Sequence, residues 1–514
     1  MKQLIAIFTL LCAVALSSCV TEPELSGEEL ESRSLRAWMK KNKPELLENH
    51  QTKGDYYVHV LEWGEAAPAK SDNDFGGLPI MEQDTCWMIY NFTGYDLTGD
   101  VCVTRNSLTA RMQNSFSKNT HYVPFLNYCG STNSYSLTEG TYLATRNILK
   151  LGQTYVENNG FASSDFVMRK GSKVRLYLPS TVGYGSTGTT QEGGYEGQFQ
   201  LDTNVPVIMD VEVVKVIKNP SDFEVEMVDC IVEDANARAG KEVWHTVPTE
   251  KENTDEDSAE SSNSTSTETK NETYTGLYYT TEYKPGDETL SPKYMTVASD
   301  VVGESYTDSY DTGRYADMKA LDEAIAKALN EKFAKMELAE DDEQAKEVGK
   351  NNSAVIWYIA RFFDGFVLDT NIPEVRELVF DTNDETTSSA LTYNASTNKE
   401  DYVGAWYHCI PKLKYGRWGA IITTSGYAYG AEGISGSTSS SSTSSSYYDY
   451  GYGYGYYDYY NYYNSYSYPY YMSYPVYDTP SYTYDGETGA ISTEVQPYTP
   501  LLFYVFIEPT KSTE

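Results

Sequence analysis

Residues Leu176–Gly188 read LYLPSTVGYGSTG, and residues Ile421–Gly433 read IITTSGYAYGAEG. In each stretch an apolar run that favours a β-strand is followed by small residues and a Tyr-Gly pair that favour a turn. The two stretches therefore predict the same strand and the same turn twice in one chain. If the chain contains two copies of one domain, the segments that flank the first stretch should correspond to those that flank the second.

The flanking segments do correspond, and in the same order. In the second copy, VIWYIARFFDGFVLDTN is followed by YVGAWYHCIPKLKYGRWG and finally by VQPYTPLLFYVFIEP. In the first copy, WMIYNFTGYDLTGDVCVTRN is followed by GFASSDFVMRKGSKV and then by VPVIMDVEVVKV. Apolar runs bounded by turn residues predict strands at DYYVHVLEW, TCWMIYNF, KVRLYLPS, VPVIMDVEVVKVI, SAVIWYIARFF, RWGAIITTS and PLLFYVFIEP.

This order of motifs resembles the FKBP-type peptidyl-prolyl cis-trans isomerases. The resemblance covers residues 54–217 and 275–509, apart from insertions. It implies an α+β fold with two FKBP-like domains, each an antiparallel half-barrel sheet wrapped on a short helix, with helical and low-complexity insertions. The alternative is a pair of unrelated sheet domains that share common turn residues.

The resemblance places a prolyl-peptide site in the second copy, made of an indole floor, apolar walls, a tyrosine hydroxyl and a carboxylate. The implied catalytic residues are Tyr358, Asp369, Trp406 and Tyr429, and the implied substrate-binding residues are Leu368, Val403, Val495 and Phe503. Leu368 stands where the family usually has phenylalanine, and Thr424 where it usually has proline. The alternative for Trp406, Phe503 and Asp369 is a purely structural role, since buried aromatic and turn carboxylate side chains are common.

The first copy departs further from the family pattern. Its aligned residues are Phe92, Cys102, Val103, Phe161, Tyr184 and Met209, and of these only Tyr184 is unchanged. The aligned carboxylate and strand tyrosine are both missing. We therefore expect a degenerate first domain, either structural or peptide-binding, and activity mainly in the second.

The N-terminus resembles a bacterial lipoprotein signal. Met1 and Lys2 precede an apolar run from Leu4 to Leu16, and LSSC ends at Cys19. The resemblance implies lipidation at Cys19 and an outer membrane lipoprotein of a Gram-negative bacterium that faces the periplasm or the cell surface. The alternative is an ordinary signal peptide with an incidental cysteine.

Composition divides the rest of the chain. We expect a signal peptide at 1–18, an acidic tether and short helix at 19–53, a first FKBP-like domain at 54–218, a strand-like extension and acidic Ser/Thr-rich linker at 219–274, and a second domain at 275–509. Within the second domain, apolar spacing predicts a helical insert at 315–348, and residues 434–490 form an insert rich in Tyr, Ser and Gly.

The formal charge and the sequence motifs limit the classes of function that we expect for the chain. A formal charge of −35 argues against nucleic acid, which would repel the chain, so membrane contact is expected only through the lipid. The five histidines are scattered and no metal-site or nucleophile motif surrounds them, so no cofactor or metal is expected. The predicted function is a prolyl isomerase that acts on proline-containing polypeptides and assists folding of exported proteins. The alternative is a non-catalytic surface lipoprotein that binds peptides or glycans through the tyrosine-rich insert; the oligomeric state stays open.

Overall fold

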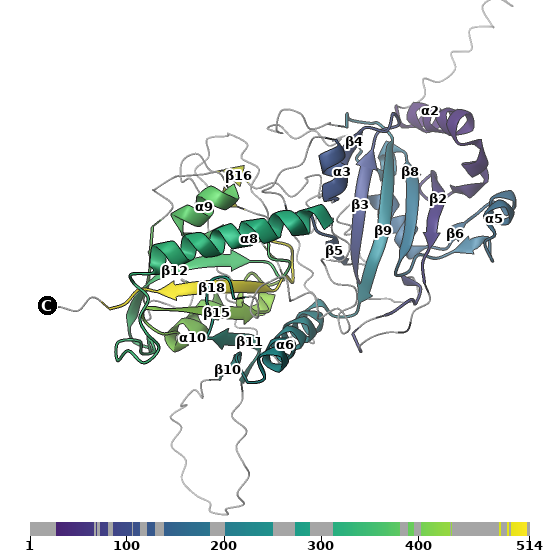
Figure 1. Cartoon of the computed structure of the whole chain (residues 1–514). Coiled ribbons are helices and arrows are strands. Elements are labelled where there is room, and N and C mark those ends of the chain that lie inside the picture. The colour runs from purple at the N-terminus through teal and green to yellow at the C-terminus, as the bar shows by residue number, and fades with distance from the viewer. Residues whose placement is uncertain are drawn as a thin grey trace, which may run out of the picture.

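The structure is a computed structural model that describes residues 27–65, 68, 72–73, 75–80, 86–104, 106–113, 121–128, 138–185, 201–249, 273–287, 312–380, 389–394, 402–431, 433, 483–484, 491–492 and 495–510. The signal segment with Cys19, the acidic stretch and most of the tyrosine-rich insert lie outside these residues. Figure 1 shows two sheets, one from the N-terminal half of the chain and one from the C-terminal half. Within the described ranges, none of the helices combines the length and apolar character needed to cross a bilayer.

The first sheet has seven antiparallel strands. Its order is β1 (His50–Gln51), β2 (Tyr56–Trp63), β8 (Ser172–Leu178), β9 (Val207–Ile217), β3 (Trp87–Tyr95) and β4 (Val101–Thr104), with β5 (Phe125–Tyr128) also on β3. Around it lie α2 (Gly27–Asn42), η1 (Pro44–Asn49), α3 (Ser107–Met112), α4 (Glu139–Arg146), α5 (Gln153–Asn159) and η3 (Ser180–Val182), and the short pair β6 (Leu149–Lys150) and β7 (Asp165–Phe166).

The second sheet also has seven antiparallel strands. Its order is β10 (His245–Pro248), β11 (Thr273–Thr280), β15 (Arg417–Thr423), β18 (Leu501–Ile507), β12 (Ser353–Arg361) and β13 (Val367–Thr370), with β14 (Leu391–Asn394) also on β12. Its helices are α6 (Pro220–Ala239), α8 (Thr312–Phe333), α9 (Pro373–Phe380), α10 (Gly404–Cys409), η7 (Ile410–Lys412) and η8 (Ser425–Tyr427), and β16 (Thr483–Tyr484) pairs with β17 (Ile491–Ser492).

The two sheets match strand for strand. Both place the strand of the repeated Tyr-Gly motif, β8 or β15, between the first long strand and the last one. The register agrees as well, because Gly94 of β3 lies opposite Met209 of β9, while Ala360 of β12 lies opposite Phe503 of β18. The expected fold class is therefore confirmed, and the alternative of unrelated sheets is wrong. We call α2 to β9 the first repeat and α6 to β18 the second repeat.

Each repeat begins with a helix that packs into it, and the sequence analysis missed the second of these. The strand-like extension expected from residue 219 is wrong, because α6 begins there. The Asn219 side chain accepts a hydrogen bond from the backbone of Ser221, Pro220 takes the first turn, and Gly240 ends the helix with φ 66°. Its apolar side chains recur at helical spacing and are buried, namely Phe223, Met227, Val228, Ile231, Val232 and Ala235.

The acidic stretch between residues 249 and 273 does not lie between two domains, contrary to the sequence prediction. β10 precedes it and β11 follows it, and the two strands are paired, with His245 opposite Tyr279. The stretch therefore joins two neighbouring strands of the second sheet, and does not separate two domains.

The helical insert is shorter than expected. The predicted helix at 315–348 is wrong beyond Phe333, where α8 ends. After it, the backbone N–H of Leu338 donates to the carbonyl of Gly416, and that of Val348 donates to the carbonyl of Leu413. The sequence ELAEDDE that follows would place like charges one turn apart and acids at a helix C-terminus, both unfavourable.

The second sheet is covered on both faces, so β18 is buried at every position. Leu501, Phe503 and Val505 pack with α10 on one face, whereas Tyr504 and Phe506 pack with α8 on the other. Figure 1 shows α8 lying along β12 and β18. This double covering leaves the α10 face as the one that carries the predicted site.

Candidate active site

Trp406 lies on α10 and packs against two aromatic rings of the second sheet. Its ring centroid is 4.9 Å from that of Tyr358 on β12 at 68°, and 5.6 Å from that of Phe503 on β18 at 78°. These are edge-to-face contacts, which fix ring orientation better than stacking alone. Only 7% of Trp406 is exposed. The short helix thus places the indole on the face of the sheet, as the resemblance implied.

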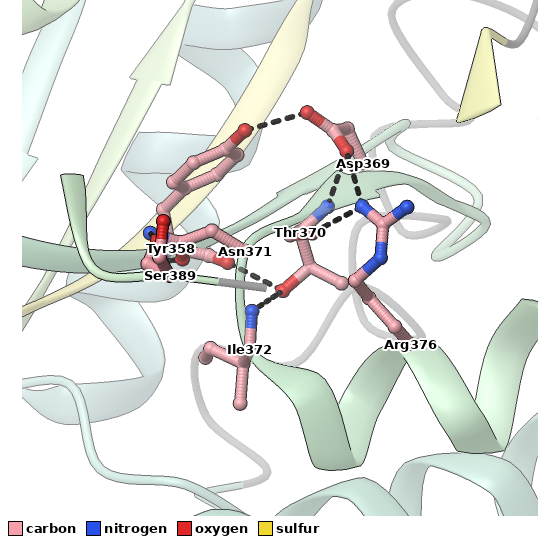
Figure 2. Close-up of polar contacts among 7 residues, drawn as sticks. All are labelled: Tyr358, Asp369, Thr370, Asn371, Ile372, Arg376 and Ser389. Carbon is pink, nitrogen blue, oxygen red and sulfur yellow. Dashed lines mark hydrogen bonds and ion pairs between the residues drawn. The ribbon is translucent and has the colours of Figure 1, made fainter. Parts of the chain in front are cut away.

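A chain of polar contacts runs from this aromatic group to α9 (Figure 2). The Tyr358 hydroxyl donates to Oδ2 of Asp369 at 2.6 Å, and Oδ1 of Asp369 lies 3.7 Å from Nη1 of Arg376. Burial, followed by the negative charge of Asp369, raises the pKa of Tyr358 well above its usual value. The phenol therefore stays protonated and keeps the carboxylate in one orientation.

Arg376 was not singled out from the sequence. Its side chain is 3% exposed, and Nη1 also donates to the backbone carbonyl of Thr370 at 3.0 Å. The only sequence signal is an arginine inside the short apolar helix PEVRELVF, directly after the strand that carries Asp369. A buried arginine needs a partner of opposite charge, and Asp369 is that partner.

Two polar side chains beside Asp369 fix the end of β13 against β12. The Thr370 hydroxyl donates to the carbonyl of Tyr358 at 2.6 Å and accepts from the N–H of Ile372 at 3.1 Å. The Asn371 amide accepts from the N–H of Tyr358 at 2.8 Å and donates to the carbonyls of Ile356 and Ser389. Figure 2 shows these groups below the Tyr358–Asp369 pair. The backbone that follows Asp369 is thereby held against β12.

Tyr429 lies in the turn after β15. The turn begins at Ser425, whose carbonyl accepts from the N–H groups of Ala428 and Gly430, both at 2.8 Å. Ser425 is held in turn by Glu224 of α6, which accepts from its backbone N–H and, at 2.7 Å, from its hydroxyl. Tyr429 packs against the same core cluster as Trp406 and Phe503.

The remaining predicted residues join this group. Leu368, Val403 and Val495 are 4%, 8% and 2% exposed and belong to the same core cluster. The structure therefore brings together Tyr358, Leu368, Asp369, Val403, Trp406, Tyr429, Val495 and Phe503, which we call the Trp406 cluster.

One polar atom of the Trp406 cluster lacks a partner. Nε1 of Trp406 is buried and, among the described residues, no acceptor lies within hydrogen-bond reach of it. A buried N–H without an acceptor costs about 1–3 kcal/mol, so this atom is available to a ligand carbonyl at little cost.

In the first repeat the same strand positions are filled with apolar side chains. Val103 lies opposite Gly94, as Asp369 lies opposite Ala360. A Cβ atom on Gly94 would lie 2.7 Å from Cγ1 of Val103 and 3.0 Å from Sδ of Met209. The Tyr184 hydroxyl donates to Sδ of Met209 at 3.9 Å. Phe92, Val103, Tyr184 and Met209 are all at most 2% exposed, and Cys102 packs on them.

Phe161 differs from its expected position. It follows Gly160, which ends α5 with φ 67°, and so does not lie on the helix as Trp406 does. Its ring packs at 4.9 Å from Trp63 and 5.9 Å from Tyr155. The connection from α5 to β8 contains β7, which pairs with β6 on the other side of α5.

No family model matches the chain, and no curated protein matches its sequence. Several solved structures do. The three FKBP domains of wheat FKBP73 share 9% identity at a TM-score of 0.19, covering 89% of this chain and 95% of that one. FkpA from Escherichia coli shares 15% at a TM-score of 0.21, covering 42% of this chain and 71% of that one. A peptidyl-prolyl cis-trans isomerase from Pseudomonas syringae shares 18% at 0.18, covering 37% and 95%.

The solved structures to which this chain is similar include a protein with three FKBP domains and a peptidyl-prolyl cis-trans isomerase.

Proposed function

We propose that the second repeat is a peptidyl-prolyl cis-trans isomerase that acts at the Trp406 cluster. The observation that carries the proposal is the buried Trp406 indole, held edge-on by Tyr358 and Phe503, beside a carboxylate fixed by Tyr358 and Arg376. Among the described residues, this site combines buried aromatic rings with a few hydrogen-bonding groups, and none of its side chains forms a nucleophile–base pair.

That chemistry fits rotation about an X-Pro bond. Rotation has a barrier of about 18–20 kcal/mol, which arises from loss of amide resonance and involves no bond to be broken. A site that favours the twisted amide over the planar one lowers the barrier. In the proposed complex, the proline ring contacts Trp406 and Phe503, the Tyr429 hydroxyl donates to a substrate carbonyl, and Asp369 supplies a fixed charge beside the rotating amide.

The test is an isomerisation assay on the full-length chain, made soluble by Cys19→Ser, with a short prolyl peptide. Trp406→Ala and Asp369→Ala should each lower kcat/KM at least about tenfold, or about 1.4 kcal/mol. Trp63→Ala is the matched control, because it removes a tryptophan that packs on Phe161 and Phe166 in the first repeat. An unmodified chain without activity, or equal losses in all three variants, would contradict the proposal.

We propose further that the chain is anchored by lipid at Cys19 in the outer membrane of a Gram-negative bacterium, where it assists folding of exported proteins. The support is the signal sequence ending in LSSC. Cys19→Ala should move the protein from the membrane fraction to the soluble fraction of cells. Protease treatment of intact cells separates a surface-facing from a periplasm-facing anchor.

A further inference from the structure

A segment of the first repeat, residues 121–128, lies against two loops of the second repeat. The first is the loop between β12 and β13, residues 362–366. The second is the segment 495–500 that leads into β18. Each loop continues directly into the Trp406 cluster, the first to Leu368 and Asp369 and the second from Val495 to Phe503.

His121 holds the first loop. Its Nε2 lies 2.7 Å from Oδ2 of Asp364, and both side chains are buried, at 8% and 5% exposure. Its ring stacks on Phe362 with centroids 4.1 Å apart at 10°, and lies 4.7 Å from the ring of Phe366. The other carboxylate oxygen of Asp364 accepts from the backbone of Phe366. One imidazole thus contacts the start, middle and end of the loop.

Gln496 holds the second segment. Its side-chain oxygen accepts from the N–H of Leu126 at 3.0 Å, and its side-chain nitrogen donates to the carbonyl of Pro124 at 3.1 Å. The side-chain amide therefore both accepts and donates a hydrogen bond, as the backbone of a strand paired with the edge of β5 would do. Two residues on, the ring of Tyr498 packs on Trp87 of β3, with centroids 5.1 Å apart.

The second segment also connects to the turn that carries Tyr429. The backbone N–H of Tyr498 donates to the carbonyl of Gly430 at 3.0 Å, and the N–H of Gly433 donates to the carbonyl of Tyr429 at 3.1 Å. The first repeat thus contacts segments that continue to Asp369 and Val495, and it contacts Tyr498, which bonds to the turn that carries Tyr429.

The two repeats also share one apolar core. Ile89, Leu126 and Ile217 of the first repeat belong to the same buried cluster as Ile359, Leu502 and the apolar face of α6. A shared core makes the support rigid, because close-packed interiors transmit displacement and do not absorb it.

We propose that the first repeat supports the site of the second, and that His121 and Gln496 are the positioning residues through which it acts. This gives a role to a repeat whose own corresponding positions are filled by Val103 and Met209. The proposal rests on the proposed prolyl isomerase activity for its kinetic readout. Catalysis that depends on orientation is sensitive to loop displacements of under 1 Å.

The experiment compares His121→Ala and Gln496→Ala in the full chain, each measured in two ways. Hydrogen exchange should become faster in peptides covering 362–370 and 495–503. The value of kcat/KM for a prolyl peptide should fall about five- to tenfold, while His121→Gln, which retains a donor for Asp364, should recover part of both effects. Asp210→Asn is the control, because it weakens the Arg175–Asp210 pair within the first sheet and leaves the contacts between repeats intact.

The outcomes separate the two proposals. Unchanged exchange in both loops, or faster exchange with unchanged kcat/KM, would overturn the supporting role of the first repeat. An equal fall of kcat/KM in Asp210→Asn would overturn it as well, since the effect would then be general loss of stability. If the unmodified chain shows no isomerase activity while His121→Ala still speeds exchange in both loops, the proposed function fails and the mechanical coupling stands.

Discussion

The Glu224 carboxylate on α6 accepts hydrogen bonds from both the backbone N–H and the hydroxyl of Ser425. The Glu31 carboxylate on α2 accepts the same two hydrogen bonds from Ser180. The two serines begin η8 and η3, the turns that carry Tyr429 and Tyr184. Each repeat therefore uses the helix in front of its sheet to hold the turn after its Tyr-Gly strand. Both carboxylates are buried, at 1% exposure for Glu224 and 8% for Glu31.

Glu224 should make stability depend on pH. Burial, the largest effect, raises its pKa from 4.5 to about 7 although the bonds from Ser425 lower it. The folded chain therefore holds this proton more tightly than the unfolded chain. The resulting stability is complete below about pH 4.5 and is lost as the pH rises through 7, a change on the order of 3 kcal/mol.

Glu224→Gln should remove that loss, because a neutral amide can accept from the Ser425 N–H and donate to its hydroxyl. Urea unfolding at pH 5 and pH 8 should show a smaller difference in the variant than in the unmodified chain. Glu31→Gln, the same change in the first repeat, should retain the Glu224 contribution. Identical pH dependence in Glu224→Gln and the unmodified chain would show that Glu224 is not the titrating group.

Arg376→Leu should lower both stability and activity. It removes the charge facing Asp369 and the donor to the Thr370 carbonyl, and a buried carbonyl without its donor costs about 1–3 kcal/mol. Asp369 keeps its bonds from the Tyr358 hydroxyl and the Thr370 N–H but loses the neighbouring positive charge, so kcat/KM for a prolyl peptide should fall as well, measured well below the unfolding temperature. Arg417→Leu is matched, since Arg417 also donates to a backbone carbonyl, Leu338, and pairs with a carboxylate at 3.8 Å. It should lower stability without lowering kcat/KM.

Tyr429→Phe and Tyr184→Phe form a matched pair, because the two tyrosines occupy the same position of the two repeats. Tyr429→Phe should lower kcat/KM for a prolyl peptide, since it removes the donor proposed for the substrate carbonyl. Tyr184→Phe should leave kcat/KM within a few-fold, because that hydroxyl already donates to Met209 inside the first repeat. A larger loss in Tyr184→Phe would assign the activity to the first repeat.

Deletion of Ser435–Tyr484 should spare a short prolyl peptide and weaken binding of longer or glycosylated substrates, if the tyrosine-rich insert is a recognition surface. The described residues that flank the insert, Gly433 and Val495, lie against each other at the Trp406 cluster. The measurement is kcat/KM for short and long substrates with and without the insert. Equal ratios for both substrate lengths would show that the insert takes no part in recognition.

The sequence predicted most of the long strands, because their apolar runs reflect burial between helices and sheet, but it missed the eight-residue β11. All seven predicted strands correspond to β2, β3, β8, β9, β12, β15 and β18. The sequence-based prediction failed where the spacing of apolar residues fitted both a helix and a strand, or where a segment forms a strand only through pairing with a distant one. Short edge strands such as β4 and β13 gain their structure from the partner strand and carry little signal of their own.

The residues of the candidate site also differ in whether they could be predicted from the sequence. The family resemblance assigned side chains on strands, such as Tyr358 and Phe503, correctly to one group. Once the register of two paired strands is set, the position of a residue along its strand determines which residues lie next to it. Arg376, Glu224 and Gln496 could not be predicted, because each acts across more than one element, and nothing local marks a charged or amide side chain as buried. Phe161 was misplaced because the alignment matched it to a helical residue, whereas α5 ends at Asn159.

The meeting of Gly433 and Val495 has a consequence for how this chain could be re-engineered. A Cβ atom on Gly433 would lie 2.1 Å from the carbonyl oxygen of Val495, so the chain leaves the second repeat and returns to it at one point. A foreign module whose own termini are adjacent, such as a fluorescent reporter, can be spliced in there with little loop-closure penalty.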